Sequence, residues 1–463
     1  MEGPTRAPCV SRSGDQGATM GGDPLDLPVR VDLLEEPATL AINGGTPVRN
    51  RPFPAWPCFD KADEAAVLAA LRSGRWGSRP SDGFGNEFAT SLAKFQGARR
   101  AIATANGTVA LEVALKAVGV MPLDEVIVPA YTFIATATAV LALGAIPIFA
   151  DLDPETYTID PQDAARRVTS HTRAIVPVHL AGQPADMDGI MAVARTHGLR
   201  VVEDAAQAIG ASWRGKGVGT IGDIGTFSFQ SSKNLNAGEG GAITTDDEAL
   251  ADMAWSLANC GRVPGGAWYH HDITGSNYRM TEIQASLLLS QLARLPGQFA
   301  RREQSARVLD DGFRSIPGLA PQARPTAITG HAHHLYVLRY DPKGFGGRPR
   351  RWFIDAMRAE GIPCSPGYEV PLHRMPGVIA ARRTWIDLAL RTGRRVLVSD
   401  DPDEVGLRVT DRASREEGIW FSQSLLLGED DDMVDVVEAA RRIRAWCNYS
   451  GPSFPLPPQR GRD

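Results

Sequence analysis

Short runs of apolar residues alternate with stretches of helical character through the first half of the chain. Strands that are apolar along their whole length are buried on both faces, and helices between them allow neighbouring strands to run parallel. The pattern therefore predicts an α/β fold in which helices cover both faces of a mostly parallel sheet. The four clearest runs are Glu125–Val128, Ile146–Ala150, Arg173–Val178 and Leu199–Glu203.

Two further strands, Gly225–Phe229 and Gly241–Thr245, complete this predicted sheet. We assign it to a large domain of residues 37–293. From about Arg294 a longer helical stretch leads to a smaller α/β domain, residues 294–450, with a strand at Leu335–Tyr340.

The two ends of the chain, residues 1–36 and 451–463, are rich in Gly, Pro and Arg and have no apolar periodicity. Such segments bury too little apolar surface to fold, so we expect both to be disordered. A start of translation at Met20 is an alternative for the first.

Composition excludes several classes of function. A net charge of -5 gives no reason to expect nucleic acid as a partner, and no apolar run is long enough to span a membrane. The early arginines precede no apolar run of the signal-peptide type. The five cysteines are far apart and show no Cys-x-x-Cys spacing, which predicts no metal site and reduced thiols in the cytoplasm.

Lys233 follows the predicted strand Gly225–Phe229 and is followed by a glycine cluster. A lysine at the mouth of a packed sheet can lose its proton by desolvation and attack a carbonyl group. The alternative is a solvated surface lysine, which is the more common case for an isolated residue of this kind.

Asp204 ends the predicted strand Leu199–Glu203, and Gln207 follows three residues later. A carboxylate at the carboxyl end of a strand in an open α/β sheet points into the ligand crevice. There Asp204 would keep a pyridine nitrogen protonated, as pyridoxal phosphate chemistry requires, and Gln207 would reach the ring hydroxyl. A helix-capping aspartate is the alternative.

Two segments supply groups for the rest of such a cofactor. Gly107 and Thr108 begin a predicted helix whose free backbone amides would bind a phosphate, with Ser228 as a further donor. Phe133 or Tyr131 offers a flat surface on which a pyridine ring could stack. A simple turn and a pair of core aromatics are the respective alternatives.

These segments resemble, in order and spacing, the pyridoxal-phosphate-dependent sugar aminotransferases of the DegT/StrS-like family, a branch of the aspartate aminotransferase fold. The resemblance runs from about Leu40 to about Arg444 and includes the segments Pro177–Gly182, Gly275–Glu282 and His333–Tyr336. It implies a fold-type I transferase with a large, mostly parallel seven-stranded domain and a small C-terminal α/β domain.

The resemblance also implies a role for each candidate residue. Lys233 would be the Schiff-base lysine and the base that moves the proton, and Asp204 would be the partner of the pyridine nitrogen. The other cofactor contacts would come from Gln207 at the ring hydroxyl, Phe133 as the stacking ring, and Gly107, Thr108 and Ser228 at the phosphate.

The segment Gly275–Arg279 resembles a loop that, in similar enzymes, reaches across a dimer interface to the neighbour's cofactor phosphate. It implies a homodimer with a shared active site, in which Asn277, Arg279 or both make the contact. A solvent-facing loop with an incidental arginine is the alternative.

The family contains dehydratases in which histidine replaces the lysine, so Lys233 favours transamination here. The expected reaction is a ping-pong transfer from glutamine or glutamate to a keto substrate. Family members aminate nucleotide-linked ketosugars or free cyclitol ketones such as inososes, and a close branch makes aminohydroxybenzoate. The segments Phe53–Pro57, Phe229–Lys233 and Gly238–Gly241 look more like the cyclitol and aminohydroxybenzoate branch.

We therefore expect a keto-cyclitol substrate, with a nucleotide-linked ketohexose or an aminohydroxybenzoate precursor as the alternatives. A nucleotide-binding dehydrogenase would need a Gly-x-Gly-x-x-Gly turn, which the region around Asn106 lacks. A catalytically retired regulator would usually have lost Lys233 or Asp204. Candidate substrate residues are His179, His334, Tyr368 and His373.

Arginines are frequent after Pro342, which leaves two interpretations open. They would hold an anionic substrate through arginine forks, or they would lie on solvated helix faces, the interpretation we favour. The segment 379–420 is longer and more polar than is usual in the family. The arginines are Arg348, Arg350, Arg351, Arg382, Arg383, Arg391, Arg394 and Arg395.

Overall fold

The computed structural model describes residues 38–77, 83–267, 269–393 and 401–450. The two ends that we expect to be disordered, together with Arg394 and Arg395, lie outside the described residues.

A seven-stranded sheet forms the centre of the larger region, with the strand order β1-β9-β8-β5-β4-β2-β3. Strands β8, β5, β4, β2 and β3 run parallel to one another, and β9 runs antiparallel to both β8 and β1. The predicted α/β class and mostly parallel sheet are confirmed. The strands are β1 Arg100–Thr104, β2 Glu125–Pro129, β3 Ile146–Ala150, β4 Thr172–Ile175, β5 Arg200–Asp204, β8 Ile224–Ser228 and β9 Gly241–Thr245.

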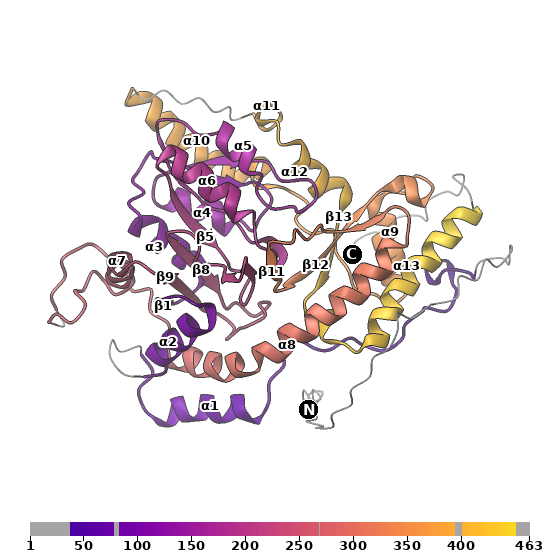
Figure 1. Ribbon diagram of the computed structural model, residues 1–463, viewed down its shortest axis with the longest axis horizontal. Helices are drawn as coiled ribbons and strands as arrows, with labels where there is room; N and C mark the ends of the chain where they lie inside the picture. Colours follow the sequence, from indigo (N-terminus) through magenta and orange to yellow (C-terminus); the bar gives the residue numbers. More distant parts are fainter. Residues whose placement is uncertain (1–37, 78–82, 268, 394–400, 451–463) are drawn as a thin grey trace.

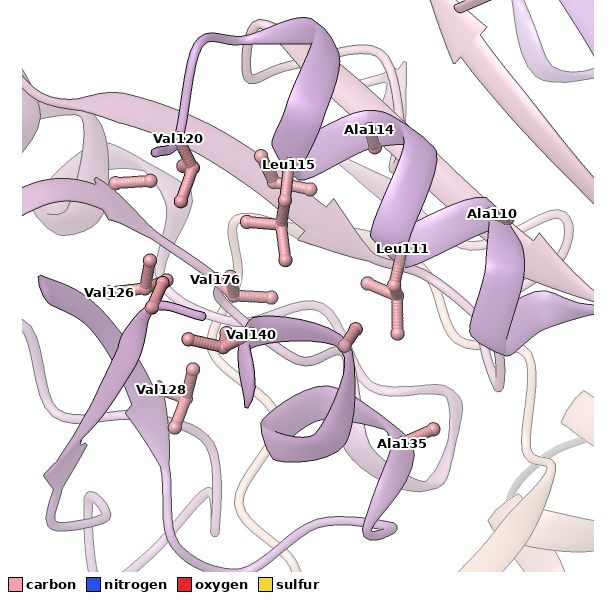
Figure 2. Close-up of a cluster of buried hydrophobic side chains, with 14 of the residues drawn as sticks. Ala110, Leu111, Ala114, Leu115, Val120, Val126, Val128, Ala135, Val140 and Val176 are labelled. Carbon is pink, nitrogen blue, oxygen red and sulfur yellow. The ribbon is translucent and has the colours of Figure 1, made fainter. Parts of the chain in front are cut away.

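Helices cover both faces of this sheet (Figure 1). On one face, α3 and α4 pack against the apolar strand residues, as Leu111, Leu115, Val128 and Val140 show in Figure 2. On the other face α5 and α6 cover the β2, β3 and β4 side, and α2 with α8 covers the β8 and β9 side. The helices are α1 Lys61–Arg72, α2 Phe84–Gln96, α3 Gly107–Ala117, α4 Ala135–Ala142, α5 Pro161–Arg166, α6 Met187–His197 and α7 Glu248–Ala258.

The long helix α8, Glu282–Arg314, connects the two regions of the molecule. Thr281 caps its first turn, because the Thr281 hydroxyl accepts from Gln284 N while the Gln284 side chain accepts from Thr281 N. The helix packs against α1 and α2 at one end and against α13, Asp430–Ser450, at the other (Figure 1). It therefore begins before the predicted start of the helical stretch at Arg294.

The smaller region is built on an antiparallel sheet with the order β10-β12-β13. Its core contains Phe313, Tyr336, Phe353 and Phe421, all buried. Its elements are β10 Leu319–Pro321, β12 Leu335–Tyr340, β13 Gly418–Ser422, α9 Arg350–Ala359 and α13 Asp430–Ser450. A separate three-stranded sheet has the order β11-β6-β7, with β11 Ile328–Gly330, β6 Ser212–Trp213 and β7 Lys216–Gly217.

Part of the C-terminal segment returns to the large sheet. Helix α10, Pro376–Arg391, packs against α4 and β3, with Val378 and Ile386 buried there. The two short helices α11 Pro402–Val405 and α12 Arg408–Arg412 follow it. The backbone amides of Val409 and Thr410 both donate to the Asp151 carboxylate.

Candidate active site

A cavity of about 870 Å³ lies at the carboxyl ends of the parallel strands, where the large region meets the small one. This is the edge at which open α/β sheets bind ligands. The large region contributes the lining residues Asn106, Gly107, Thr108, Thr132, Phe133, Asp204, Gln207, Ser228 and Lys233, among others. The small region contributes His334, Leu335, Tyr368, Trp420, Ser422, Gln423 and Ser424.

Lys233 lies in the loop that follows β8, and its side chain lines the cavity. The loop turns tightly, because the Lys233 backbone N–H donates to the Gln230 carbonyl at 2.8 Å. Burial lowers the pKa of the Lys233 ammonium to about 8, and the nearby Asp204 carboxylate opposes that shift. A substantial fraction of this amine is therefore neutral near physiological pH, as a nucleophilic lysine requires.

Asp204 ends β5, and its side chain is 5% exposed. The Thr136 hydroxyl donates to its Oδ2 at 2.8 Å and the Ala206 backbone N–H donates to its Oδ1 at 3.2 Å. Burial raises the pKa of this carboxyl, against the effect of these two hydrogen bonds. Within the described residues no cation donates a hydrogen bond to Asp204, so a ligand carrying a protonated nitrogen would find a buried acceptor there.

Glu203 precedes Asp204 on β5 and points to the opposite face, since side chains alternate along a strand. Its Oε2 is 2.9 Å from His179 Nε2, and His179 Nδ1 accepts from the Ala185 backbone N–H. Both residues are fully buried, and neither lines the cavity. The structure thus places His179 in the fold's interior and away from the predicted substrate contact.

Gln207 and Tyr368 form a pair on the cavity wall. Gln207 Oε1 accepts from the Ala181 backbone N–H at 2.7 Å, and its Nε2 donates to the Tyr368 hydroxyl at 3.3 Å. The backbone N–H can only donate, so it fixes which end of the amide is the oxygen. The two side chains, predicted from distant segments, are therefore brought together.

Gly107, Thr108 and Ser228 also meet at the cavity, as predicted for a phosphate site. The Asn106 side chain caps α3, which leaves the helix N-terminus directed at the cavity. A Cβ atom at Gly107 would lie 2.7 Å from Ser228 Cβ, closer than side chains approach one another. Glycine is therefore required for the contact between the start of α3 and the end of β8.

The two aromatic candidates of the Tyr131–Phe133 segment differ in position. Phe133 is 55% exposed and lines the cavity, whereas Tyr131 is buried against Tyr157, Tyr368 and Trp420. Phe133 is therefore free to stack on a ligand ring, and Tyr131 is a core residue.

Three further predicted residues lie outside the cavity lining. His373 is buried, with its ring near Phe149 and its Nε2 3.5 Å from Asp411 Oδ1. Asn277 is exposed, and Arg279 Nη1 contacts Cys260 Sγ at 3.6 Å. The structure gives His373 no contact with the cavity, and it leaves Asn277 on a surface loop.

His334 does line the cavity, and its position follows from the register of the small sheet. Leu335 of β12 pairs with Ser422 of β13, so the residues flanking this pair, His334 and Gln423, lie at the same edge. His334 Nδ1 is 3.2 Å from Asn234 Oδ1. Burial lowers the pKa of His334 well below its usual range, so the ring is neutral.

Several residues that line the cavity or hold a lining side chain in place are absent from the sequence-based predictions. Thr136, which holds Asp204, and Trp56, whose indole N–H donates to the Ser231 carbonyl at 3.0 Å, lie inside segments that carried the family resemblance. Ser422 and Gln423 end and follow β13, an antiparallel strand, and the rule that identified Asp204 applies only to the carboxyl ends of parallel strands.

The arginines after Pro342 do not line the cavity in the described part of the chain. The expectation of solvated helix faces is wrong for Arg348, Arg350 and Arg382, which are buried. Arg350 donates to four backbone carbonyls, those of Pro366, Ala413, Ser414 and Gly418. Arg348 lies over the rings of Trp352 and Trp446, and Arg382 donates to the Pro147 carbonyl. Each stabilises the fold, because carbonyl and aromatic contacts satisfy a buried guanidinium. Arg351, Arg383 and Arg391 are exposed.

No helix within the described ranges is long and apolar enough to cross a membrane. Among those same residues no group of three or more His, Cys, Asp or Glu side chains is arranged to hold a metal ion.

Comparison with known proteins identifies relatives along most of the chain. An L-glutamine:2-deoxy-scyllo-inosose aminotransferase from Streptoalloteichus tenebrarius is 37% identical over 421 residues, which cover 88% of this chain and 98% of the relative. The crystal structure of 3-amino-5-hydroxybenzoic acid synthase is similar with a TM-score of 0.76 and 34% identity, covering 87% of this chain and all of that one.

A third similar structure, NtdA from Bacillus subtilis, was solved with the cofactor PMP bound. It is 26% identical, with a TM-score of 0.69, and the match covers 83% of each chain. The family model of the DegT/DnrJ/EryC1/StrS aminotransferases, whose members depend on pyridoxal phosphate, matches residues 57–385. The match spans more than half of the sequence, and the chain belongs to the DegT/DnrJ/EryC1/StrS aminotransferase family of fold-type I, pyridoxal-phosphate-dependent enzymes.

Proposed function

We propose that this aminotransferase moves an amino group from glutamine, or from glutamate, to the ketone of a free cyclitol. The relatives named for L-glutamine and an inosose support both halves of this proposal. A nucleotide-linked ketohexose and a precursor of aminohydroxybenzoate are the competing acceptors.

The side chains of the cavity wall favour an uncharged acceptor. Among the described residues the charged side chains that line the cavity are Asp204, Lys233 and Glu239. A nucleoside diphosphate would need cations to hold its phosphates, and no arginine in the described ranges lines the wall. Serine hydroxyls, amides and the Tyr368 hydroxyl are instead suited to a polyhydroxylated, uncharged ring.

The donor set fits pyridoxal phosphate. Asp204 is a buried acceptor without a cationic partner among the described residues, suited to a protonated pyridine nitrogen. Gly107 leaves room beside Ser228 at the start of α3 for a phosphate, with Thr108 as a further donor. Phe133 would cover the ring and Gln207 would reach its hydroxyl, as predicted from the sequence.

When bound, pyridoxal phosphate supplies an aldehyde that condenses with amines and a ring that accepts electrons. Lys233 supplies the neutral amine that the low pKa of its side chain makes accessible. The same amine would act as the base that moves the substrate proton. The Asp204 carboxylate would keep a proton on the ring nitrogen, and Thr136 holds that carboxylate in place.

We also propose that the active unit is a homodimer, to which the Gly275–Arg279 loop contributes Asn277 or Arg279 at the neighbour's phosphate site. Two features support this: Asn277 is exposed, and neither side chain lines the cavity of its own chain. Measurement of the mass in solution tests the assembly.

The function is tested on the purified protein by visible absorbance. Glutamine should bleach the cofactor band, and a keto-cyclitol such as 2-deoxy-scyllo-inosose should restore it, with nucleotide ketohexoses as the comparison. Recovery with the nucleotide sugar alone would refute the cyclitol proposal. A protein that takes up no pyridoxal phosphate would refute the family chemistry as a whole.

A further inference from the structure

Arg302 of α8 is a buried cation directly behind the cavity wall. Its side chain is 0% exposed, and its guanidinium lies 5.5 Å from the ring centroid of Trp56, which lines the cavity. Within the described residues no carboxylate pairs with it, and Nη1 has no hydrogen-bond partner. Burying a guanidinium without a paired carboxylate is costly, so the neutral acceptor that satisfies it must be held in place.

The contact that Arg302 makes is with Gln423, a residue of the cavity wall. Arg302 Nε and Nη2 donate to Gln423 Oε1 at 3.1 Å and 2.5 Å, and Nε also approaches the Gln423 carbonyl at 3.4 Å. Gln423 is itself 2% exposed. Both side chains are therefore held in one arrangement.

This contact decides which way the Gln423 amide points. Arginine is a donor without any acceptor atom, so the amide must offer it the oxygen and turn the NH₂ group away. No acceptor among the described residues contacts that NH₂ group. Gln423 thus presents a fixed donor, adjacent to the hydroxyl-bearing Ser422 and Ser424, on the small-region wall of the cavity.

The charge of Arg302 adds to this donor. A guanidinium stays charged at neutral pH even though burial lowers the pKa of Arg302 to about 9. Its field polarises the Gln423 amide, and an amide polarised by a cation is a stronger donor to an anionic oxygen. On the opposite wall, Asp204 and Glu239 carry negative charge, so an anionic group would be driven toward the Gln423 side.

We propose that Gln423, held and polarised by Arg302, binds a carboxylate of the substrate and is a specificity-determining residue of this cavity. The inference rests on the proposed aminotransferase function. This carboxylate has two possible sources. One is the α-carboxylate of the amino donor, and the other is a ring carboxylate on an acceptor of the hydroxybenzoate type. Arg302 acts through Gln423 and is a positioning residue.

The decisive variant is Gln423→Glu in the cofactor-loaded protein. A glutamate keeps both Arg302 hydrogen bonds and pairs its charge, so the fold is retained, but it replaces the NH₂ donor with an anionic oxygen. Calorimetric titration with glutaramate, which is glutamine without its amino group, measures carboxylate binding without turnover. 3-Hydroxybenzoate is the probe for a ring carboxylate, and the neutral amides glutaramide and 3-hydroxybenzamide are the respective control ligands.

We expect wild-type protein to bind one of the two carboxylates at least about tenfold more tightly than its neutral counterpart, since a charge-assisted hydrogen bond contributes that much. Gln423→Glu should abolish this preference. If the variant loses the preference for glutaramate, the site binds the amino donor. If it loses the preference for 3-hydroxybenzoate, the site binds the acceptor. Arg302→Met should weaken binding of the same carboxylate. Arg307→Met, which removes an exposed arginine of the same helix, should leave that binding unchanged.

Two results would overturn the inference: no carboxylate preference in the wild type, or an unchanged preference in Gln423→Glu. Both are separable from failure of the proposed function. If the wild type still transfers nitrogen from glutamine to a ketone, the aminotransferase proposal stands while the role of Gln423 is wrong.

Discussion

The two walls of the cavity are built on different principles. The large-region wall carries the residues proposed to react, Asp204 at the end of β5 and Lys233 in the loop after the neighbouring parallel strand β8. The small-region wall carries uncharged side chains, such as Tyr368, His334 and Gln423. They come from the edge of an antiparallel sheet and from the loop before β13. The contrast indicates that one region performs the chemistry and the other selects the substrate. Substitutions on the first wall should therefore lower kcat, and those on the second should raise KM.

Lys233→Ala is the largest expected effect. It removes both the nucleophile and the base, so kcat should fall by about 10⁴-fold or more. Steady-state kinetics and the visible spectrum measure the loss of turnover and of covalently held cofactor. Lys216→Ala, which removes an exposed lysine, is the matched control. Full activity in Lys233→Ala would contradict the assignment of the reaction to the large-region wall.

Asp204→Asn should lower kcat by about 10²- to 10³-fold, because the ring nitrogen loses its anionic partner. The protein should still bind some cofactor through the phosphate site. Asp223→Asn removes a carboxylate that accepts from Val201 N at the far end of β5, and should leave kcat within about twofold. Near-normal rates for Asp204→Asn would contradict the assigned role.

The pH dependence of cofactor uptake reports on Lys233 directly. Because burial lowers its pKa to about 8, the rate of pyridoxal phosphate capture by the cofactor-free protein should rise with pH and level off above 8. Well below that pH the neutral fraction changes about tenfold per pH unit. Asp204→Asn should move the midpoint to lower pH, since Asp204 holds the pKa of Lys233 up. A rate still rising at pH 10 would mean that Lys233 is not desolvated.

Tyr368→Phe tests the selecting wall. It removes the hydroxyl that accepts from Gln207 and faces the cavity, and should raise KM for the keto substrate about three- to tenfold with little change in kcat. Tyr336→Phe is the matched control, because its buried hydroxyl bonds to Asp310 outside the cavity lining. A loss confined to kcat would break the division between the walls.

The smallest kinetic effect is expected for His373→Asn. His373 was a substrate candidate from its sequence, but it is buried beside Phe149 and outside the cavity lining. We expect kcat/KM to change by less than about twofold, with a lower melting temperature because a buried ring is lost. A large kinetic effect in a variant of normal stability would place His373 on the selecting wall after all.

The sequence predicted the sheet and one wall of the cavity well. Asp204 and Ser228 end neighbouring strands and Lys233 follows one of them, so the parallel arrangement alone brings them to one edge. The small-region wall was predicted only in part. Tyr368 and His334 were candidates, but Gln423 and its partner Arg302 were not, because an antiparallel strand end carries no signal of which edge faces a ligand.

The candidates that the structure buries away from the cavity share a physical cause. His179 follows a strand as Asp204 does, yet it pairs with Glu203, whose side chain lies on the opposite side of β5 from Asp204. Arg350 looked like a solvated helix residue, but four carbonyls from distant segments satisfy it when it is buried. Whether such a polar side chain is buried depends on hydrogen-bond partners that lie far away in the sequence, so a local pattern does not predict its burial.

By itself, the sequence determined the α/β class, the mostly parallel sheet and the candidate pair Lys233 and Asp204, because apolar periodicity and strand ends are local patterns. Tertiary structure alone decided which polar residues face the cavity and which are buried as partners of one another. It also placed Arg302 behind Gln423, 121 residues apart along the chain, where a buried cation fixes the direction of an amide. Such a contact depends on how α8 docks against β13, and no local pattern encodes it.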